Sequence, residues 1–163
     1  MRSRPEGTAA FRAPWGWVLL NWGGRGLREL RIRARKPRGG VRDPLPASIA
    51  RAVRRALRGL PFRPPRYDLD GMTPFQRKVL LELSRLPSGR LITYGGLAKR
   101  IGRPRASRAV GQAVGRNPIP LLIPCHRVVA ARNGIGGFSS GLSLKQKMLK
   151  NEGFTVNYGR KVL

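Results

Sequence analysis

Residues 91–118 read LITYGGLAKRIGRPRASRAVGQAVGRNP, and this stretch decides the fold of the second half of the chain. Its apolar residues recur at helical spacing over roughly 94–100 and again over roughly 105–115. Gly102 and Pro104 interrupt the pattern between the two runs. Two helices joined by so short a turn are the outline of a helix-turn-helix.

The second of these helices presents arginines on a surface that is otherwise made of small side chains. The arginines are Arg105 and Arg108, and the small residues are Ala106, Ala109, Gly111, Ala113 and Gly115. So small a surface could approach DNA closely, in a shallow or narrow groove. Close packing of two helices without any DNA would need the same composition, so both interpretations stand at this point.

Net charge is the strongest signal in the composition. The 163 residues include 34 Lys and Arg but seven Asp and Glu, which gives a formal charge of +27. Such a surface favours polyanions, because each neutralised phosphate releases condensed counterions. A membrane-surface binder and a merely soluble basic protein are the alternatives. The excess of Arg over Lys fits nucleic-acid binding, and a GC-rich genome would also produce it.

Several classes of protein are excluded or disfavoured by composition. No segment approaches the roughly 18 apolar residues of a membrane helix, and the start of the chain lacks the features of a signal peptide. We therefore expect a soluble, intracellular protein that does not bind membranes. One cysteine excludes an intramolecular disulfide and a thiolate zinc site, and with one histidine as well a transition-metal site of side chains is not expected. The GIGG of residues 134–137 lacks the spacing of a nucleotide-binding fingerprint, so no cofactor is expected.

The first part of the chain predicts a small unit of strands and one helix. Residues 1–14 are polar and punctuated by proline, which predicts a loose segment, and 36–46 predicts a loop. Residues 15–22 and 27–35 predict the two strands of a hairpin around a turn at 23–26. A helix is expected over 46–60, opened by Ser48 or Pro46 and closed by Gly59, before a linker at 61–66.

The second part predicts further helices around one short strand. Thr73 and Pro74 predict the start of a helix that runs over 75–86. The apolar run IPLLIP at 119–124 predicts a strand, and 131–141 a glycine-rich loop. A final helix is expected over 142–154, with Leu144, Met148 and Leu149 toward the core and Gly153 as a cap.

The cysteine and the histidine are neighbours, Cys125 and His126, at the end of that apolar run. A thiol reacts as its thiolate, so it needs a base, and His126 could serve directly or through a water. A carboxylate orienting the imidazole would complete the relay, and the candidates are Glu152, Glu82 and Asp70. The alternative is structural: a lone Cys in an apolar run is usually a small buried hydrophobe.

The residues PCHRV, together with NPIPLLI before them, resemble the active-site signature of the O6-alkylguanine-DNA alkyltransferases. Four further blocks resemble the C-terminal domain of that family, so the resemblance covers about residues 70–154: TPFQRKVLLELSRLPSG, ITYGGLAKRIGRP, SRAVGQAVGRNP and GGFSSGLSLKQKMLKNEG. It implies a protein that flips an O6-alkylated guanine out of double-stranded DNA and takes its alkyl group irreversibly. Each molecule would act once, without metal or cofactor.

The resemblance also implies catalytic roles for residues at matching positions. Cys125 would accept the alkyl group, and His126 would deprotonate it through a water, with Glu152 polarising the imidazole. Asn117 would hold the turn that joins the helix-turn-helix to the active-site segment. Tyr94 would protonate the departing guanine at N3 and help to rotate the phosphate.

Substrate contacts are implied in the same way. The carbonyls of Cys125 and Val128 would read the exocyclic amine of guanine, and the amide of Ser139 would contact O6. Pro120, Phe138 and Ser140 would surround the alkyl group, and Arg108 would fill the vacated stack. The residues expected to bind DNA are Arg105, Ala106, Ser107, Arg108, Ala109, Gly111, Gln112 and Arg116.

Two departures from the family concern the alkyl pocket. Phe138 stands where relatives often carry Tyr, and Ser140 stands where Gly or another small residue is common. Both leave the tolerated alkyl size open. The cysteines and histidines that bind zinc in the N-terminal domain of some relatives are absent from this sequence.

The sequence therefore predicts an α/β (α+β) architecture of two domains. Residues 1–66 would form a small N-terminal domain and linker, and 67–163 a mainly helical DNA-binding domain. The second domain would contain a winged-helix-like helix-turn-helix at about 93–115 and the active-site strand with PCHR at 119–128. The expected protein is a monomer in a prokaryotic cytoplasm, associated with the nucleoid. The alternatives are a non-catalytic alkyltransferase-like lesion binder and a general basic DNA-binding protein.

Overall fold

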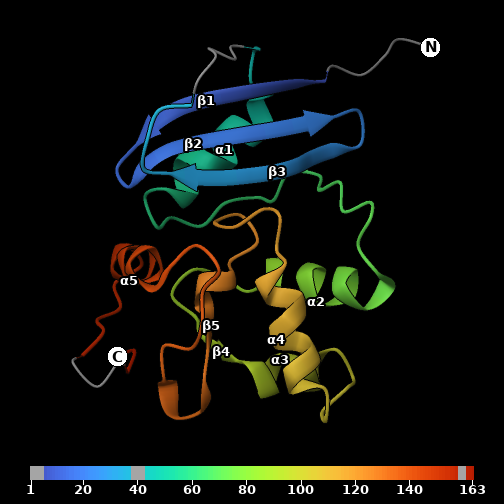
Figure 1. Cartoon of the computed structure of the whole chain (residues 1–163), viewed down its shortest axis with the longest axis vertical. Coiled ribbons are helices and arrows are strands. Elements are labelled where there is room, and N and C mark those ends of the chain that lie inside the picture. The colour runs from blue at the N-terminus through green and yellow to red at the C-terminus, as the bar shows by residue number, and fades with distance from the viewer. Residues whose placement is uncertain (1–5, 38–42, 158–160) are drawn as a thin grey trace.

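The computed structural model describes residues 6–37, 43–157 and 161–163. Its first part is a three-stranded antiparallel sheet in the order β1-β2-β3, formed by β1 (Gly7–Ala13), β2 (Gly16–Gly23) and β3 (Gly26–Arg33) (Figure 1). Alternate residues of β2 point to one face of the sheet, where Val18, Leu20 and Trp22 are buried. The predicted hairpin is thus confirmed as β2 and β3.

The prediction of a loose segment over 1–14 was wrong for the residues that form β1. This strand pairs with β2 along its whole length, from Gly7 opposite Trp22 to Ala13 opposite Gly16. Its sequence, GTAAFRA, has little strand propensity of its own, so the neighbouring strand supplies the order. Residues 1–5, and 38–42 of the predicted loop, lie outside the described residues.

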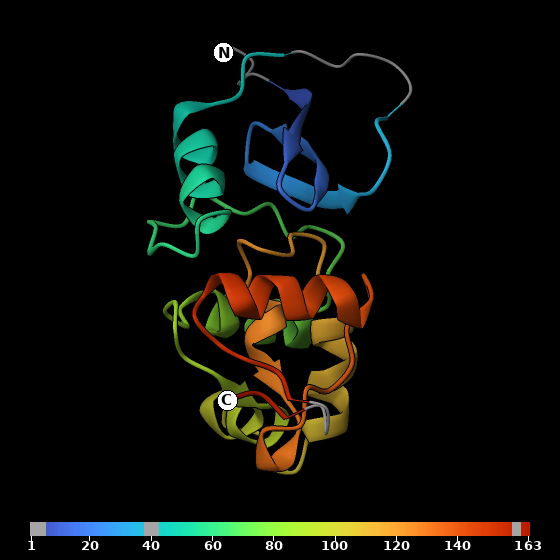
Figure 2. The same ribbon diagram turned by 90° about the vertical axis from the view of Figure 1, so that its left-hand side faces the viewer.

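Helix α1 (Ala47–Ala56) packs on the buried face of this sheet (Figure 2). Its apolar stripe of Ile49, Val53 and Ala56 is buried, as the helical spacing predicted. Pro46 occupies the N-cap position, whereas Ser48 lies within the helix and does not cap it. Gly59 has a φ of 67° and ends the turn that follows, so it closes the helix as expected.

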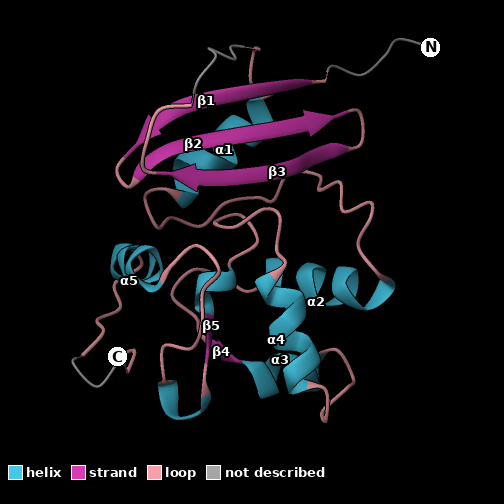
Figure 3. Ribbon diagram, viewed as in Figure 1, coloured by secondary structure: helices cyan, strands magenta, loops and turns pink. Residues whose placement is uncertain are grey.

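The second part of the chain is mainly helical. It contains the helices α2 (Pro74–Ser84), α3 (Tyr94–Arg100), α4 (Ser107–Gly115) and α5 (Leu142–Asn151), and two short parallel strands, β4 (Ile92–Thr93) and β5 (Val128–Val129) (Figure 3). The Thr73 side chain accepts a hydrogen bond from the Gln76 amide, and the Gln76 side chain accepts one from the Thr73 amide, which gives the start of α2 a capping box.

Helices α3 and α4 pack against each other and against α2, which confirms the helix-turn-helix. Helix α3 has the predicted bounds, and α4 begins two residues later than predicted, because a turn closed by the Ala106 amide and the Arg103 carbonyl precedes it. The final helix is confirmed but ends at Asn151, three residues early, and Gly153 follows it with a φ of 89°.

The predicted strand over 119–124 was wrong. This segment is a succession of turns in which Leu121 has a φ of 75° and the Ile123 amide donates to the Ile119 carbonyl. Three prolines in and beside the run lack the amide hydrogen that a sheet requires. The run is nevertheless buried, since its four aliphatic side chains are at most 2% exposed. In the glycine-rich loop, one 3-10 turn, η2 (Ala131–Asn133), interrupts the expected irregular structure.

Strand β3 is the edge of the sheet that faces the helical part (Figure 1). The Leu27 amide donates to the Arg66 carbonyl at 2.9 Å, and the Leu27 carbonyl accepts from the Asp68 amide at 2.8 Å. Further along, the Leu30 amide donates to the Pro118 carbonyl at 2.9 Å. The first two hydrogen bonds join the sheet to the end of the linker and the segment that follows it, and the third joins it to the loop that carries the cysteine. One hydrophobic core runs through both parts.

None of the helices formed by residues 6–37, 43–157 and 161–163 has the length and the apolar character needed to cross a membrane.

Candidate active site

The loop before Cys125 is shaped by the side chain of Asn117. Asn117 Nδ2 donates to the Ile123 carbonyl at 2.8 Å, and Asn117 Oδ1 accepts from the Ile119 amide at 3.0 Å. The Asn117 side chain thereby holds the two ends of this turn together, whereas a strand would have kept the segment extended. This geometry supports the role expected for Asn117, which is to connect the end of α4 to the reactive segment.

Cys125 begins a single 3-10 turn, η1 (Cys125–Arg127), and is 5% exposed. Burial raises the pKa of its thiol to about 11, although a hydrogen bond from Asn117 and the charge of Lys145 act in the opposite direction. The unassisted thiol is therefore protonated at neutral pH. A nucleophilic role for Cys125 requires a base within the site.

His126 is buried and bound to a carboxylate, as the sequence anticipated. Its Nε2 lies 2.8 Å from Glu152 Oε1. Burial lowers the pKa of the imidazole, so the ring is neutral at pH 7, and Nε2 carries the hydrogen that Glu152 accepts. The lone pair is then on Nδ1, which is buried and makes no hydrogen bond within the described part of the chain. A buried imidazole with an available lone pair can act as a base.

The other two acids considered for this relay serve elsewhere. Glu82 pairs with Arg85 at 3.1 Å, and Asp70 pairs with Arg25 at 2.5 Å. The structure thus selects Glu152, the residue at the C-terminal end of α5, as the partner of His126.

Arg127 is a buried member of the site that the sequence analysis did not identify. Its Nε and Nη2 donate to both oxygens of Glu152, at 2.8–3.1 Å. Its Nη1 donates to the Leu86 carbonyl, and Nη2 also donates to Ser88 Oγ. Burial alone would raise the pKa of Glu152, but the hydrogen bonds and charges of His126 and Arg127 lower it to about 2. The carboxylate is therefore ionised inside the core.

Lys145 is the second buried cation that was missed. Its side chain is 0% exposed, and Nζ donates to the Val128 carbonyl at 2.6 Å and to the Gly137 carbonyl at 3.2 Å. Burial lowers its pKa to about 8. A signal was present in the sequence, because Lys145 lies three and four residues before the core residues Met148 and Leu149 on the same helical face.

Tyr94 lies between the helix-turn-helix and the glycine-rich loop. Burial raises the pKa of its phenol, while a hydrogen bond with the backbone of Gly137 opposes this shift. A Cβ built on Gly111 of α4 would lie 3.7 Å from the Tyr94 ring, and one on Gly136 would lie 3.1 Å from its hydroxyl. Both glycines therefore let Tyr94 pack closely, and the phenol remains protonated and able to donate.

The residues expected to bind DNA are gathered on and around α4. Val110, Ala113 and Val114 form its buried face, whereas all eight expected residues are exposed or half-buried. Arg105 and Ala106 precede the helix and Arg116 caps its end, so they flank α4. The side chains of Arg105, Arg108 and Arg116 make no hydrogen bond or ion pair with any residue that the structure describes.

The residues expected around the alkyl group come from two loops. Phe138 is half-buried against the core, with Lys145 Nζ 6.0 Å from the centre of its ring. Ser139 and Ser140 are exposed in the turn that the Gly141 amide closes onto the Phe138 carbonyl. Pro120 and Ser140 border one groove together with Asn117, and the Asn117 side chain also contacts the thiol.

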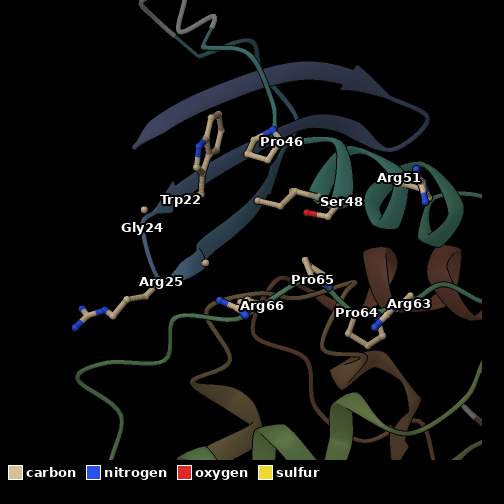
Figure 4. Close-up of a pocket in the computed structure, with 13 residues that line it drawn as sticks. Trp22, Gly24, Arg25, Pro46, Ser48, Arg51, Arg63, Pro64, Pro65 and Arg66 are labelled. Carbon is tan, nitrogen blue, oxygen red and sulfur yellow. The ribbon is translucent and has the colours of Figure 1, made fainter. Parts of the chain in front are cut away.

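Another groove, of about 570 Å³, lies between the β2–β3 turn, α1 and the linker, away from the cysteine (Figure 4). It is bordered by Trp22 and by Arg51, Arg63 and Arg66, and it shares no lining residue with the candidate active site. In the described ranges, no cluster of three His, Cys, Asp or Glu side chains is close enough to hold a metal ion.

The ionised state of Glu152 makes the stability of the protein depend on pH. A carboxyl with a folded-state pKa near 2 and an ordinary value of 4.5 stabilises the fold above pH 4.5, and this contribution is lost as the pH falls toward 2. We expect Glu152→Gln to reduce the slope of unfolding free energy against pH in this interval, because the variant lacks the one proton that Glu152 takes up on unfolding. Urea unfolding at several pH values measures this slope. Equal slopes of unfolding free energy against pH in the two proteins would refute the ionised state of Glu152.

Comparison with known proteins gives the site a family. Residues 74–154 match the family profile described as 6-O-methylguanine DNA methyltransferase, DNA binding domain. A methylated-DNA–protein-cysteine methyltransferase of Methanosarcina acetivorans is 51% identical over 81 residues, which cover 50% of this chain and 52% of the relative. One of Shigella flexneri is 45% identical over 86 residues, 53% of this chain and 50% of the relative. The matched part thus spans about half the length of these curated relatives.

Solved structures extend the likeness over nearly the whole chain. The structure of Mycobacterium tuberculosis OGT in complex with DNA has a TM-score of 0.77 and 32% identity, and covers 89% of this chain and 91% of that one. An O6-methylguanine-DNA methyltransferase from Pyrococcus kodakaraensis has a TM-score of 0.65 and 28% identity. The match covers 91% of this chain and 99% of that one. With the fold, the reactive segment and the family profile in agreement, the chain belongs to the 6-O-methylguanine DNA methyltransferase family.

Proposed function

We propose that this protein repairs DNA by transferring the alkyl group of O6-alkylguanine to Cys125 in a single, irreversible turnover. The observation that carries the proposal is the buried contact of 2.8 Å between His126 and Glu152 next to the only cysteine. This contact orients His126 as the base that a thiol with a pKa of about 11 requires. The curated relatives are named methylated-DNA–protein-cysteine methyltransferases, in agreement with this reaction.

Thiolate formation is the first step. A water that bridges Cys125 Sγ and the unpartnered Nδ1 of His126 carries the thiol proton to the imidazole. The imidazolium that forms is stabilised by Glu152, which Arg127 keeps ionised. The Lys145 charge favours the thiolate as well.

Transfer of the alkyl group follows. The thiolate attacks the alkyl carbon, an S–C bond forms, and the bond from that carbon to guanine O6 breaks with its electron pair leaving on the base. Tyr94 is protonated at neutral pH and donates its proton to N3 of the departing guanine. Unmodified guanine is restored without a metal or cofactor, and the thioether at Cys125 ends the activity of the molecule.

Recognition of the base uses backbone groups. The carbonyls of Cys125 and Val128 accept hydrogen bonds from the exocyclic amine, and the Ser139 amide donates to O6. Lys145 already donates to the Val128 carbonyl at 2.6 Å, so its buried ammonium fixes the direction of that oxygen. Pro120, Phe138 and Ser140 enclose the alkyl group.

DNA is bound through α4. The exposed face of this helix consists mainly of small side chains and is flanked by Arg105 and Arg116, whose side chains have no partner among the described residues. The helix lies in the minor groove, and Arg108 replaces the flipped nucleotide in the stack. A net charge of +27 strengthens attachment to the phosphates. The protein acts as a monomer in a prokaryotic cytoplasm, on the DNA of the nucleoid.

We also propose that the chain divides into two domains at 66/67, in the linker before Tyr67. The family profile lies wholly within the second of these, and the sheet with α1 forms the first. In this arrangement residues 67–163 carry out the chemistry, and the N-terminal domain supports the active-site loop through β3.

The measurement of intact mass after incubation with duplex DNA that contains O6-methylguanine tests the transfer. We expect a stoichiometric gain of about 14 Da, one CH2, on Cys125. Cys125→Ser should lose the gain and keep its affinity for DNA, because the thiol lies outside the DNA-binding helix. A non-catalytic lesion binder and a general basic DNA-binding protein both predict an unchanged mass. An unchanged wild-type mass would therefore reject the transferase in favour of those alternatives.

The role of Arg108 is tested by Arg108→Ala, with Arg54→Ala as the matched loss of one exposed arginine, at the end of α1. We expect Arg108→Ala to slow methyl transfer on duplex DNA by about tenfold or more, since an unfilled stack disfavours the flipped state by a few kcal/mol. Transfer from a single-stranded oligonucleotide should change far less. A rate on duplex DNA equal to that of Arg54→Ala would remove Arg108 from the flipping step.

A further inference from the structure

A groove of about 340 Å³ separates the edge of the N-terminal sheet from the active-site loop. One wall belongs to β3, the strand nearest the helical part in Figure 1, and includes Glu29, Arg31 and Arg33. The opposite wall is formed by the loop before Cys125 and by Ser140 of the glycine-rich turn. The hydrogen bond from the Leu30 amide to the Pro118 carbonyl joins the two walls and fixes their separation.

This groove adjoins the space where the alkyl group would be transferred. Asn117 borders the groove, and its side chain also makes a hydrogen bond to the Cys125 thiol. Pro120 and Ser140, two of the residues placed around the alkyl group under the proposed function, border it as well. An alkyl group longer than methyl that passes between Pro120 and Ser140 therefore enters this groove, and its far end meets β3.

The wall formed by β3 has a definite charge. Glu29 and Arg31 form an ion pair of 2.5 Å and largely neutralise each other. The exposed side chain of Arg33 makes no hydrogen bond or ion pair with the described residues, so it leaves an uncompensated positive charge. Ile32 adds an apolar, half-buried surface beside it. Such a wall suits an apolar group that ends in a negative charge.

We propose that β3 is part of the substrate site: the groove receives the far end of bulky O6-alkyl groups, and Arg33 selects those with an anionic end over those with a cationic end. This inference rests on the proposed transfer to Cys125 and names the substrate class that the site accepts beyond methyl. The alkyl group moves intact from O6 to Sγ, as for methyl. Arg33 forms no bond to it and acts through its charge.

The test compares single-turnover transfer from three lesions in the same duplex: O6-methylguanine, O6-(4-carboxybenzyl)guanine and O6-(4-aminomethylbenzyl)guanine. The adduct on Cys125 is followed by intact mass. The variant is Arg33→Glu, and the matched control is Arg12→Glu. Arg12 is also exposed. It pairs with Trp17 of β2, which in turn pairs with Arg33, so Arg12 and Arg33 occupy equivalent positions across the sheet. Arg12 does not border the groove. The ratio of the two benzyl rates cancels any effect of either variant on DNA affinity.

We expect wild type to react faster with the carboxybenzyl than with the aminomethylbenzyl lesion. Arg33→Glu should lower this ratio about fivefold, the size expected for reversing an exposed charge near two charged substrates, and high salt should reduce the difference. Arg12→Glu should keep the wild-type ratio. Normal methyl transfer with the same ratio in all three proteins would overturn the role of the groove and leave the proposed function standing. Absence of methyl transfer in wild type would overturn both.

Discussion

The carboxylate of Glu152, held between His126 and Arg127 inside the core, is the contact on which the active site depends. A buried charge is tolerated when it is paired and fully hydrogen-bonded, and Arg127 provides this with contacts to both oxygens. Because the carboxylate stays ionised, His126 donates from Nε2, which leaves the lone pair of Nδ1 available for the proposed proton transfer. One ion pair thus determines the tautomer of the imidazole, and under the proposed function it thereby activates a thiol that burial would otherwise keep protonated.

This arrangement also determines how distant segments come together. Glu152 follows α5 and Arg127 follows the cysteine, and Arg127 also reaches Leu86 and Ser88 beyond α2. Lys145 joins the same α5 to the Val128 and Gly137 carbonyls, which both follow the reactive segment in the chain. The N-terminal sheet contributes through its edge, where β3 bonds to Pro118. The loop that holds Cys125 is therefore fixed from both parts of the chain, although it has almost no regular structure of its own.

Much of this could be predicted from the sequence, where local patterns carry the information. Thr73 and Pro74 start α2 and the helical spacing gives α3 and α4, because capping and amphipathic periodicity are local properties. The partners of Cys125 came from a family resemblance, since spacing did not distinguish Glu152 from Glu82 or Asp70. Strand β1 was missed because its order comes from pairing with β2, and residues 119–124 were mistaken for a strand because Asn117, outside the run, folds it into turns. Arg127 was missed because a buried cation is recognised from its acceptors, which are distant in sequence, whereas the helical spacing of Lys145 from Met148 and Leu149 was a local signal that was overlooked.

Under the proposed function, the His126–Glu152 contact converts Cys125 into a nucleophile. The most direct measurement is the single-turnover rate of methyl transfer to Cys125 at pH 7 in Glu152→Gln, with near-ultraviolet circular dichroism to verify that the variant is folded. An amide at this position keeps a hydrogen bond but removes the charge that stabilises the imidazolium. We expect the rate in Glu152→Gln to be lower by about a hundredfold or more, the usual contribution of a general base. A folded Glu152→Gln protein that transfers methyl within about twofold of the wild-type rate, well below that contribution, would contradict it.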